Sequence, residues 1–266
     1  MQVLVTGASG AIGKPLSEFL VRRGHAIRRL DRIPAVEIGA EVEIGARAGG
    51  EGDSDGDGEI CADIADHGAV LKACEGIDAI VHLAAIPDDA RFEDLVRPNV
   101  IGLFNVLDAA RRQAVRRVVL ASSVQVAWHR DFSERRTARH AEPLNHYALT
   151  KVWAEQMGEM YARMFPPMSI IAARIGWMVR DLREAVRMRE EAMTRHYVSR
   201  RDVSHFLACA IEAPVAGFRT LYAIGPEGRE AYDLEAAASA IGYAPQDIFP
   251  AGLPFEPPPP PSFSDR

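Results

Sequence analysis

Thr6-Gly7-Ala8-Ser9-Gly10-Ala11-Ile12-Gly13 decides the fold, because this glycine-rich stretch follows an apolar run from Gln2 to Thr6 and precedes a helical pattern from Ile12 to Arg23. Glycines are needed where a backbone turns tightly and lies close to a bound group. The first turn of the helix offers free N–H groups and the positive end of a dipole, which both attract phosphate. The stretch therefore predicts a strand, a turn and a helix that bind a dinucleotide pyrophosphate; the alternative is a tight turn without a ligand.

The sequence around this stretch alternates short apolar runs with amphipathic segments. We expect strands at Gln2–Thr6, Ala26–Leu30, around Ile60, and at Ala79–Leu83, Arg117–Ala121 and Ser169–Arg174. We expect helices at Ile12–Arg23, Asp66–Cys74, Phe92–Arg112 (bent at Pro98) and Tyr147–Phe165. Because such connections are right-handed, this order predicts an α/β fold with a doubly wound parallel sheet, the Rossmann arrangement.

The rhythm becomes less regular after Arg174. Helices are expected at Asp181–His196, Arg201–Ala213 and Asp233–Ile241, with a strand at Arg219–Ala223. We therefore divide the chain into a dinucleotide-binding domain with the catalytic residues (1–175), a small C-terminal substrate-binding portion interleaved with the sheet (176–256) and a proline-rich tail (257–266).

Composition excludes several classes of protein. The 266 residues carry a net charge of −6, which argues against a general nucleic-acid binder. No window reaches the roughly 18 apolar residues of a membrane helix, and no signal peptide is evident. The three cysteines lack metal-ligand spacing and suit a reducing cytoplasm. We expect no metal, since the histidines show no metal-binding pattern: His67, His129, His140 and His146.

One acidic, glycine-rich segment, Gly45–Glu59, departs from the pattern and is expected to be a solvated loop. Asp53, Asp55 and Asp57 resemble the start of a calcium loop. The twelfth position of that loop is Ile64 here, where a bidentate Glu is required, and this argues against calcium.

The residues after the second expected strand indicate which dinucleotide binds. Asp31 ends that strand, where a carboxylate accepts hydrogen bonds from the adenosine ribose and repels a 2′-phosphate. This favours NAD. Arg32 can pair with a 2′-phosphate, so NADP stays open.

The spacing of Tyr147 and Lys151 places both side chains on one helical face. An adjacent ammonium is expected to lower the pKa of the phenol, which makes the tyrosine a better base. The strand before this helix ends in Ala121-Ser122-Ser123, and the carboxyl ends of parallel strands face the ligand crevice. A serine hydroxyl there can hold a substrate oxygen beside the tyrosine, although either serine could instead cap a turn.

Together these motifs resemble the extended short-chain dehydrogenase/reductase superfamily, the NAD-dependent epimerase/dehydratase family, over nearly the whole chain. The motifs that carry the resemblance occur in the family's order: the glycine stretch, His82-Leu83-Ala84-Ala85, Ser122-Ser123, Tyr147-x-x-x-Lys151 and Tyr197–Val203. The resemblance implies that Ser123, Tyr147 and Lys151 are catalytic. It implies a cofactor site made of Gly7, Ser9, Gly10, Ala11, Ile12, Gly13, Asp31, Arg32, Asp63, Ile64, Leu83, Ala84, Ala85, Asn99, Ser122, Tyr147, Lys151 and Ile175.

Within the family, the length and the segment Arg174-Ile175-Gly176 look similar to uronate dehydrogenases, which oxidise the C1 hydroxyl of a hexuronic acid to a lactone. The positions that imply substrate contact are Ser123, Gln125 and Trp177. Two of these positions depart from that group, because Val124-Gln125 replaces Asn-His and Trp177 replaces Ser. The resemblance also implies a homodimer packed through Phe92–Arg112 and Tyr147–Phe165, for which the candidate apolar contacts are Leu95, Val106, Met157 and Met160.

Three functions remain open. The chain could be a dehydrogenase of a sugar, a sugar acid or a small alcohol that releases NADH, a nucleotide-sugar epimerase or dehydratase that retains NAD, or a non-catalytic NAD-sensing regulator. The arginines of Met178–His196 fit either a lid that grips an acidic sugar or a solvated helix, since acidic residues alternate with them. Trp128 and Trp177 fit either stacking on a sugar ring or ordinary packing.

Overall fold

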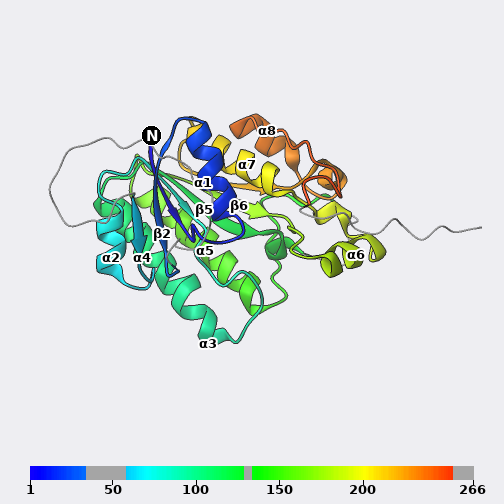
Figure 1. Cartoon of the computed structure of the whole chain (residues 1–266), viewed down its shortest axis with the longest axis horizontal. Helices are drawn as coiled ribbons and strands as arrows, with labels where there is room; N and C mark the ends of the chain where they lie inside the picture. Colours follow the sequence, from blue (N-terminus) through cyan, green and yellow to red (C-terminus); the bar gives the residue numbers. More distant parts are fainter. Residues whose placement is uncertain (34–57, 129–133, 254–266) are drawn as a thin grey trace, which may run out of the picture.

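The computed structural model describes residues 1–33, 58–128 and 134–253. Its centre is a seven-stranded, all-parallel sheet in the order β3-β2-β1-β4-β5-β6-β7 (Figure 1). The strands are β1 (Gln2–Thr6), β2 (Ala26–Asp31), β3 (Glu59–Cys61), β4 (Ala79–His82), β5 (Arg117–Ser123), β6 (Ser169–Ile175) and β7 (Phe218–Ala223). The order runs outward from β1 in both directions, which confirms the doubly wound Rossmann fold.

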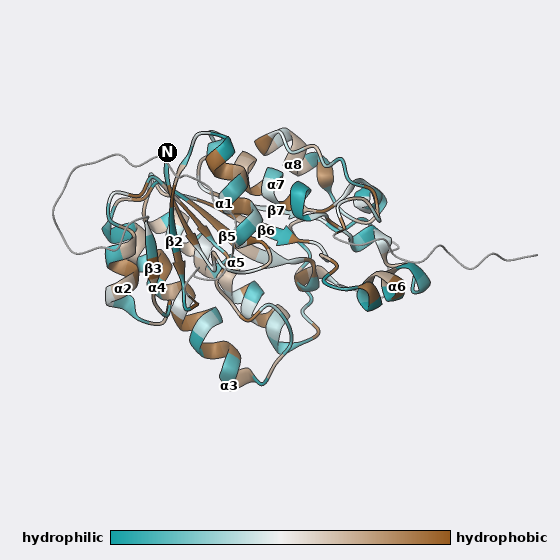
Figure 2. Ribbon diagram, in the orientation of Figure 1, coloured by the Kyte–Doolittle hydropathy of each residue, from teal (hydrophilic) through white to brown (hydrophobic). Residues whose placement is uncertain are grey.

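Helices cover both faces of the sheet, and the alternation of side chains along each strand builds a core on each face. On one face Val3 and Val5 pack with α1 (Gly13–Arg22), α7 (Arg200–Glu212) and α8 (Leu234–Ile241). On the other face Leu4 packs with α2 (His67–Ala73), α4 (Leu103–Arg112) and α5 (His146–Met164). Figure 2 shows the strands between the helices as mostly hydrophobic. Two buried faces explain why the strands read as continuous apolar runs.

The long helix predicted at Phe92–Arg112 is continuous but changes its geometry in the middle. It consists of α3 (Phe92–Leu95), the π-helical segment η1 (Val96–Gly102) and α4. Pro98 lies inside η1, where the wider helix accommodates a residue that has no N–H to donate. The predicted bend at Pro98 is therefore a π-helical segment.

The helix predicted at Asp181–His196 is shorter in the structure. Helix α6 spans Leu182–Glu190, and a separate 3-10 turn, η3, covers Thr194–His196. Ala192 has a φ of 53°, in the left-handed region, so the α-helix cannot continue through it. The remaining 3-10 turns are η2 (Val124–Ala127) and η4 (Pro226–Glu230).

Part of the sequence lies outside the described residues. The predicted loop falls there from Gly45 through Asp57, as does the proline run of the tail, so neither prediction is tested. Within the described ranges, no helix combines the length and the apolar composition needed to cross a membrane.

Candidate active site

A cavity of about 1070 Å³ lies along the carboxyl ends of the parallel strands. Every predicted site residue except Asn99 lines it, which brings together residues from β1 to the segment after β6. The predicted residues that line the cavity are Gly7, Ser9, Gly10, Ala11, Ile12, Gly13, Asp31, Arg32, Asp63, Ile64, Leu83, Ala84, Ala85, Ser122, Ser123, Gln125, Tyr147, Lys151, Ile175 and Trp177.

The glycine turn fits a closely approaching pyrophosphate. Gly7 has a φ of +70°, and a Cβ on it would lie 2.7 Å from the backbone nitrogen of Ala84. A Cβ on Gly13 would lie 2.2 Å from the carbonyl oxygen of Gly7. No side chain caps the amino end of α1, so its first N–H groups face the cavity side of the turn without a side-chain acceptor. The backbone thus has the shape and the polarity that a dinucleotide requires.

Two carboxylates, Asp31 and Asp63, also line the part of the cavity next to the glycine turn. Asp31 accepts backbone hydrogen bonds from Ser9 (2.9 Å) and Ile33 (3.1 Å), so it fixes the glycine turn against the end of β2. Asp63 accepts from the backbone of Ala65 at 2.9 Å, and this hydrogen bond keeps the pKa of the Asp63 carboxyl below its usual value. Both side chains thus present carboxylate oxygens as acceptors, as a ribose and an adenine would need.

The three predicted catalytic residues meet at the other end. Ser123 ends β5 and Tyr147 lies in the first turn of α5, and both side chains line the cavity. Lys151 lies one turn later on α5, with Nζ 5.5 Å from the centre of the Tyr147 ring. Lys151 Nζ also donates to the carbonyl oxygen of Ala121 at 2.8 Å. All three residues are buried apart from the surface that they present to the cavity.

The expectation that Lys151 lowers the pKa of Tyr147 is wrong for this structure. Burial raises the pKa of Tyr147 to about 12, against an opposing effect of the Ser123 side chain and with a smaller contribution from the Asp88 carboxylate. Burial also lowers the pKa of Lys151 to about 8. Desolvation outweighs pair attraction here because each charged form loses more water contact than its neighbours replace.

Asn99 has a structural position instead of lining the cavity. Its amide oxygen accepts from the backbone N–H of Ile86 at 2.9 Å, and its amide nitrogen donates to Ile86 O at 3.2 Å and to Thr150 Oγ1 at 3.0 Å. The residue therefore ties the segment after β4 to the catalytic helix. Its prediction as a cofactor ligand rests on the resemblance alone.

Aromatic and charged side chains line the remaining part of the cavity. Trp128 stacks on His196 at 4.7 Å and lies 5.8 Å from Trp177, while the Arg187 guanidinium lies 4.7 Å from the Trp177 ring. Gln125 accepts a hydrogen bond from Asn145 at 2.8 Å. Lining residues that the sequence did not single out for this site include Asp88, Leu144, Asn145 and Met193. Only their placement in three dimensions reveals them, since none belongs to a local motif.

Of the five arginines in the predicted lid, two line the cavity, Arg180 and Arg187. Arg180 donates to both oxygens of Glu184 and lies 3.6 Å from Asp88. Within the described ranges, no group of three or more His, Cys, Asp or Glu side chains has the geometry of a metal site.

Comparison with known proteins agrees with this geometry. Residues 3–179 match the model of the NAD dependent epimerase/dehydratase family. The chain is 29% identical to a uronate dehydrogenase of Pseudomonas syringae pv. tomato, covering 92% of this chain and 82% of that one. It is 28% identical to an NAD-dependent glucose-6-phosphate dehydrogenase of Haloferax volcanii, covering 92% and 93%.

Solved structures give the same result. Uronate dehydrogenase from Agrobacterium tumefaciens superposes with a TM-score of 0.75 at 26% identity, covering 98% of this chain and 91% of that chain. A mutant of that enzyme complexed with NAD gives a TM-score of 0.74 at 26% identity, covering 92% and 84%. Because the family model spans both the glycine turn and the catalytic helix, the chain belongs to the NAD dependent epimerase/dehydratase family.

Proposed function

We propose that this chain, an NAD-dependent oxidoreductase, oxidises a ring hydroxyl of a small sugar acid and releases NADH. One observation carries the proposal: Ser123, Tyr147 and Lys151 share a cavity with Arg187, a cation that forms no ion pair with any described residue. A free guanidinium binds a carboxylate through two parallel hydrogen bonds. Such a substrate would be held by its acid group with its hydroxyl at the catalytic residues.

Bound NAD supplies the acceptor for the hydride that leaves the substrate carbon. The chain's own residues orient the substrate and move its proton. Ser123 holds the substrate oxygen, and the phenolate form of Tyr147 takes the proton from it as the hydride leaves the carbon. Lys151 faces the same tyrosine ring and supplies a positive charge to the site below its pKa of about 8.

The relatives support a dehydrogenase over the alternatives. Two of them are named as dehydrogenases of a uronate and of a sugar phosphate, which are both anionic sugars. An epimerase that retains NAD would need no net release of NADH. A non-catalytic regulator would need no complete Ser-Tyr-Lys set. Both sequence departures from uronate dehydrogenases lie at the cavity, so the substrate panel decides which sugar acid is oxidised.

The test is a panel of substrates with NAD, followed by absorbance at 340 nm. The panel contains hexuronates, aldonates, glucose 6-phosphate, neutral aldoses and nucleotide sugars. We expect net NADH formation with a hexuronate or another sugar acid and at least tenfold lower kcat/KM with the matching neutral aldose. NADH formation with neutral aldoses alone, or none with any member, would refute the proposal.

Tyr147→Phe tests the chemical role in the same assay. The substitution removes one oxygen from a buried ring and leaves the packing unchanged. We expect a fall in kcat of at least a thousandfold, with the Kd for NADH within threefold of the parent. Full turnover in this variant would remove the tyrosine from the reaction.

The family resemblance implies a homodimer. We also propose a homodimer, but with contacts that differ from those expected from the sequence. Leu95 and Val106, two of the four predicted contacts, are fully buried within the subunit, so they cannot bind a second copy. Large apolar side chains that are exposed on α3, η1, α4 and α5 support the interface instead: Phe92, Ile101, Phe104, Leu149, Trp153, Met160 and Met164. We expect sedimentation to give a dimer for the parent chain and a monomer for Trp153→Glu; a monomeric parent would refute this.

The proposed division of labour assigns NAD to residues 1–175 and the sugar's far end to residues 176–256. Trp177 and Arg187 in the second portion support it, because they line the cavity beyond the catalytic set. The test is whether substitutions there change the KM for the sugar and leave the KM for NAD unchanged.

A cytoplasmic location is proposed from the three cysteines, which are free in the structure, and cell fractionation tests it.

A further inference from the structure

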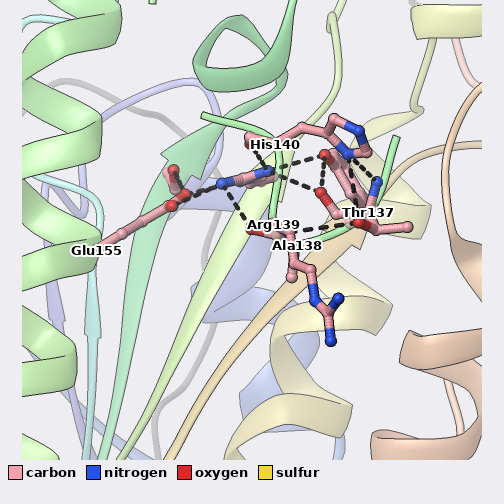
Figure 3. Close-up of polar contacts among 8 residues, drawn as sticks. Thr137, Ala138, Arg139, His140 and Glu155 are labelled. Atoms are coloured by element: carbon pink, nitrogen blue, oxygen red, sulfur yellow. Dashed lines mark hydrogen bonds and ion pairs between the residues drawn. The ribbon is translucent and has the colours of Figure 1, made fainter. Parts of the chain in front are cut away.

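A buried ion pair lies behind the catalytic residues, and the proposed reaction does not use it. Arg174 on β6 and Glu155 on α5 have side chains that are 1% and 6% exposed. Two N–H···O hydrogen bonds of 2.8 Å join them, from Nε to Oε1 and from Nη2 to Oε2 (Figure 3). Such planar, two-point geometry fixes both side chains in orientation as well as in distance.

The pair joins three elements of the catalytic end. Glu155 lies one helical turn after Lys151 on α5, on the same face. Ser122, the neighbour of Ser123 on β5, donates to Glu155 Oε1 at 2.6 Å. Ser122 is also the register partner of Arg174 across β5 and β6. The carboxylate therefore couples the strand that carries the catalytic serine to the helix that carries the tyrosine and the lysine.

The other donors of Arg174 bind the segment Thr137–His140, which is neither helix nor strand. Arg174 donates to the carbonyl oxygens of His140 (2.7 Å), Ala138 (3.3 Å) and Thr137 (3.4 Å). The Tyr222 hydroxyl links Arg174 to the segment as well, since it accepts from Arg174 at 2.9 Å and donates to Thr137 O at 3.1 Å. Figure 3 shows Thr137, Ala138, Arg139 and His140 grouped together, with Glu155 on the other side of the polar contacts that dashed lines mark. This one guanidinium is the inner support of the segment.

The segment continues directly into the substrate side of the cavity. Leu144 and Asn145 line the cavity. Asn145 accepts from the backbone N–H of Ala148 at 2.7 Å as the cap of α5 and donates to Gln125 at 2.8 Å. We expect a displacement of residues 137–140 to reach Asn145 and the first turn of α5, where Tyr147 lies, because five residues of chain or fewer separate His140 from Asn145 and from the start of α5.

We propose that Arg174 is a positioning residue, which holds segment 137–145 and thereby shapes the sugar side of the site without touching the substrate. Lysine cannot replace it, because an ammonium has three donors around a point charge and the guanidinium uses a planar fork of five. The kinetic test of this role rests on the proposed function, because it measures the KM for the sugar acid. It predicts a change in the KM for the sugar with little change in the KM for NAD, because Ser122 is the one predicted cofactor residue with a hydrogen bond to this network among the described residues, and the glycine turn and Asp31 have none.

A double variant separates positioning from stability. Removing one partner of a buried ion pair is strongly destabilising, whereas replacing both by apolar residues of similar size is often neutral. We expect Arg174→Met to lower the Tm and Arg174→Met/Glu155→Leu to recover part of that loss. We expect the KM for the sugar to stay at least tenfold raised in both variants and in Arg174→Lys, with the KM for NAD within twofold. A sugar KM that returns to the parent value in the double variant would overturn the proposal.

Arg117→Met provides a matched control. Arg117 also donates to two backbone carbonyls, those of Ala213 at 2.6 Å and Val215 at 2.9 Å, but it lies at the other end of β5. We expect a lower Tm and an unchanged sugar KM. A tenfold rise in the sugar KM of this control would mean that instability alone changes KM, and the proposal would fail.

Hydrogen exchange gives an answer that needs no substrate. We expect the amides of residues 137–147 to exchange at least tenfold faster in the double variant than in the parent chain, with β1 and α1 unchanged. Equal protection of this segment in both proteins would overturn the positioning role, whatever the substrate panel shows. Failure of the panel with faster exchange would instead reject the proposed function and leave the structural role of Arg174 intact.

Discussion

Lys151→Met should stabilise the folded chain at neutral pH while it abolishes turnover. Burial lowers the pKa of Lys151 from 10.5 to about 8, and at about 1.4 kcal/mol per pH unit this costs the folded state about 3 kcal/mol. Methionine avoids that cost but loses the hydrogen bond to Ala121 O, about 1 kcal/mol. The net gain of about 2 kcal/mol should raise the Tm by about 4–8 °C.

The pH dependence of this difference tests the cause. The folded pKa is depressed, so below pH 8 both states hold the proton and the full cost is present. Between pH 8 and 10.5 only the unfolded state holds it, so the stability of the parent chain rises with pH. Urea unfolding at pH 7 and pH 10, followed by tryptophan fluorescence, should show an advantage of the variant at pH 7 that is mostly lost at pH 10. A variant that is less stable at pH 7, or whose advantage is the same at both pH values, would refute the reasoning.

Three further outcomes follow from contacts at the cavity. Gly13→Ala places a Cβ 2.2 Å from a carbonyl oxygen of the glycine turn, so we expect the Kd for NADH, measured by fluorescence titration, to rise at least tenfold. Gly68→Ala is the control: its Cβ would lie 3.4 Å from the nearest atom, and we expect the Kd for NADH to stay unchanged. Asp31→Ala removes a carboxylate that repels a 2′-phosphate, so the ratio of kcat/KM for NADP to that for NAD should rise at least tenfold in steady-state assays. Trp177→Ala removes the ring beneath the Arg187 guanidinium, so the KM for the sugar acid should rise about tenfold with little effect on NAD; an unchanged KM would show that this stacking is not needed.

Features set by local chain order could be predicted from the sequence. The turn at Gly7–Gly13 shows itself in the sequence by a strand before it and a helix after it, and Gly13 is required by a contact within the turn itself. The spacing of Tyr147 and Lys151 is likewise a property of one helix. Right-handed connections then determine which strand ends lie together. This is why the fold, and the part of the cavity lining that belongs to local motifs, follow from the sequence.

Properties that depend on the neighbours of a side chain could not be predicted. The helices at Phe92–Arg112 and Tyr147–Phe165 carry apolar residues on more than one face, and periodicity does not say which face packs on the sheet, so Leu95 and Val106 were assigned to the wrong surface. The pKa of Tyr147 depends on how much water its ring loses, which the spacing to a lysine does not reveal. The pair Glu155 and Arg174 is 19 residues apart and belongs to no local pattern.

The arginines near α6 show why residue type alone could not decide between a lid and a solvated helix. Each interpretation describes one of the two arginines at the cavity. Arg180 is neutralised by Glu184 and Asp88, as on a solvated helix, while Arg187 lies over Trp177 at the cavity, as in a lid. A cation already held by two carboxylates has little attraction left for a third, because the negative charges of its partners repel a further anion. The Arg187 guanidinium, supported on one side by an aromatic ring, keeps its hydrogen-bond donors for a ligand. The proposed preference for an acidic sugar therefore depends on Arg187 and its ring, and the number of arginines in the segment carries no information about it.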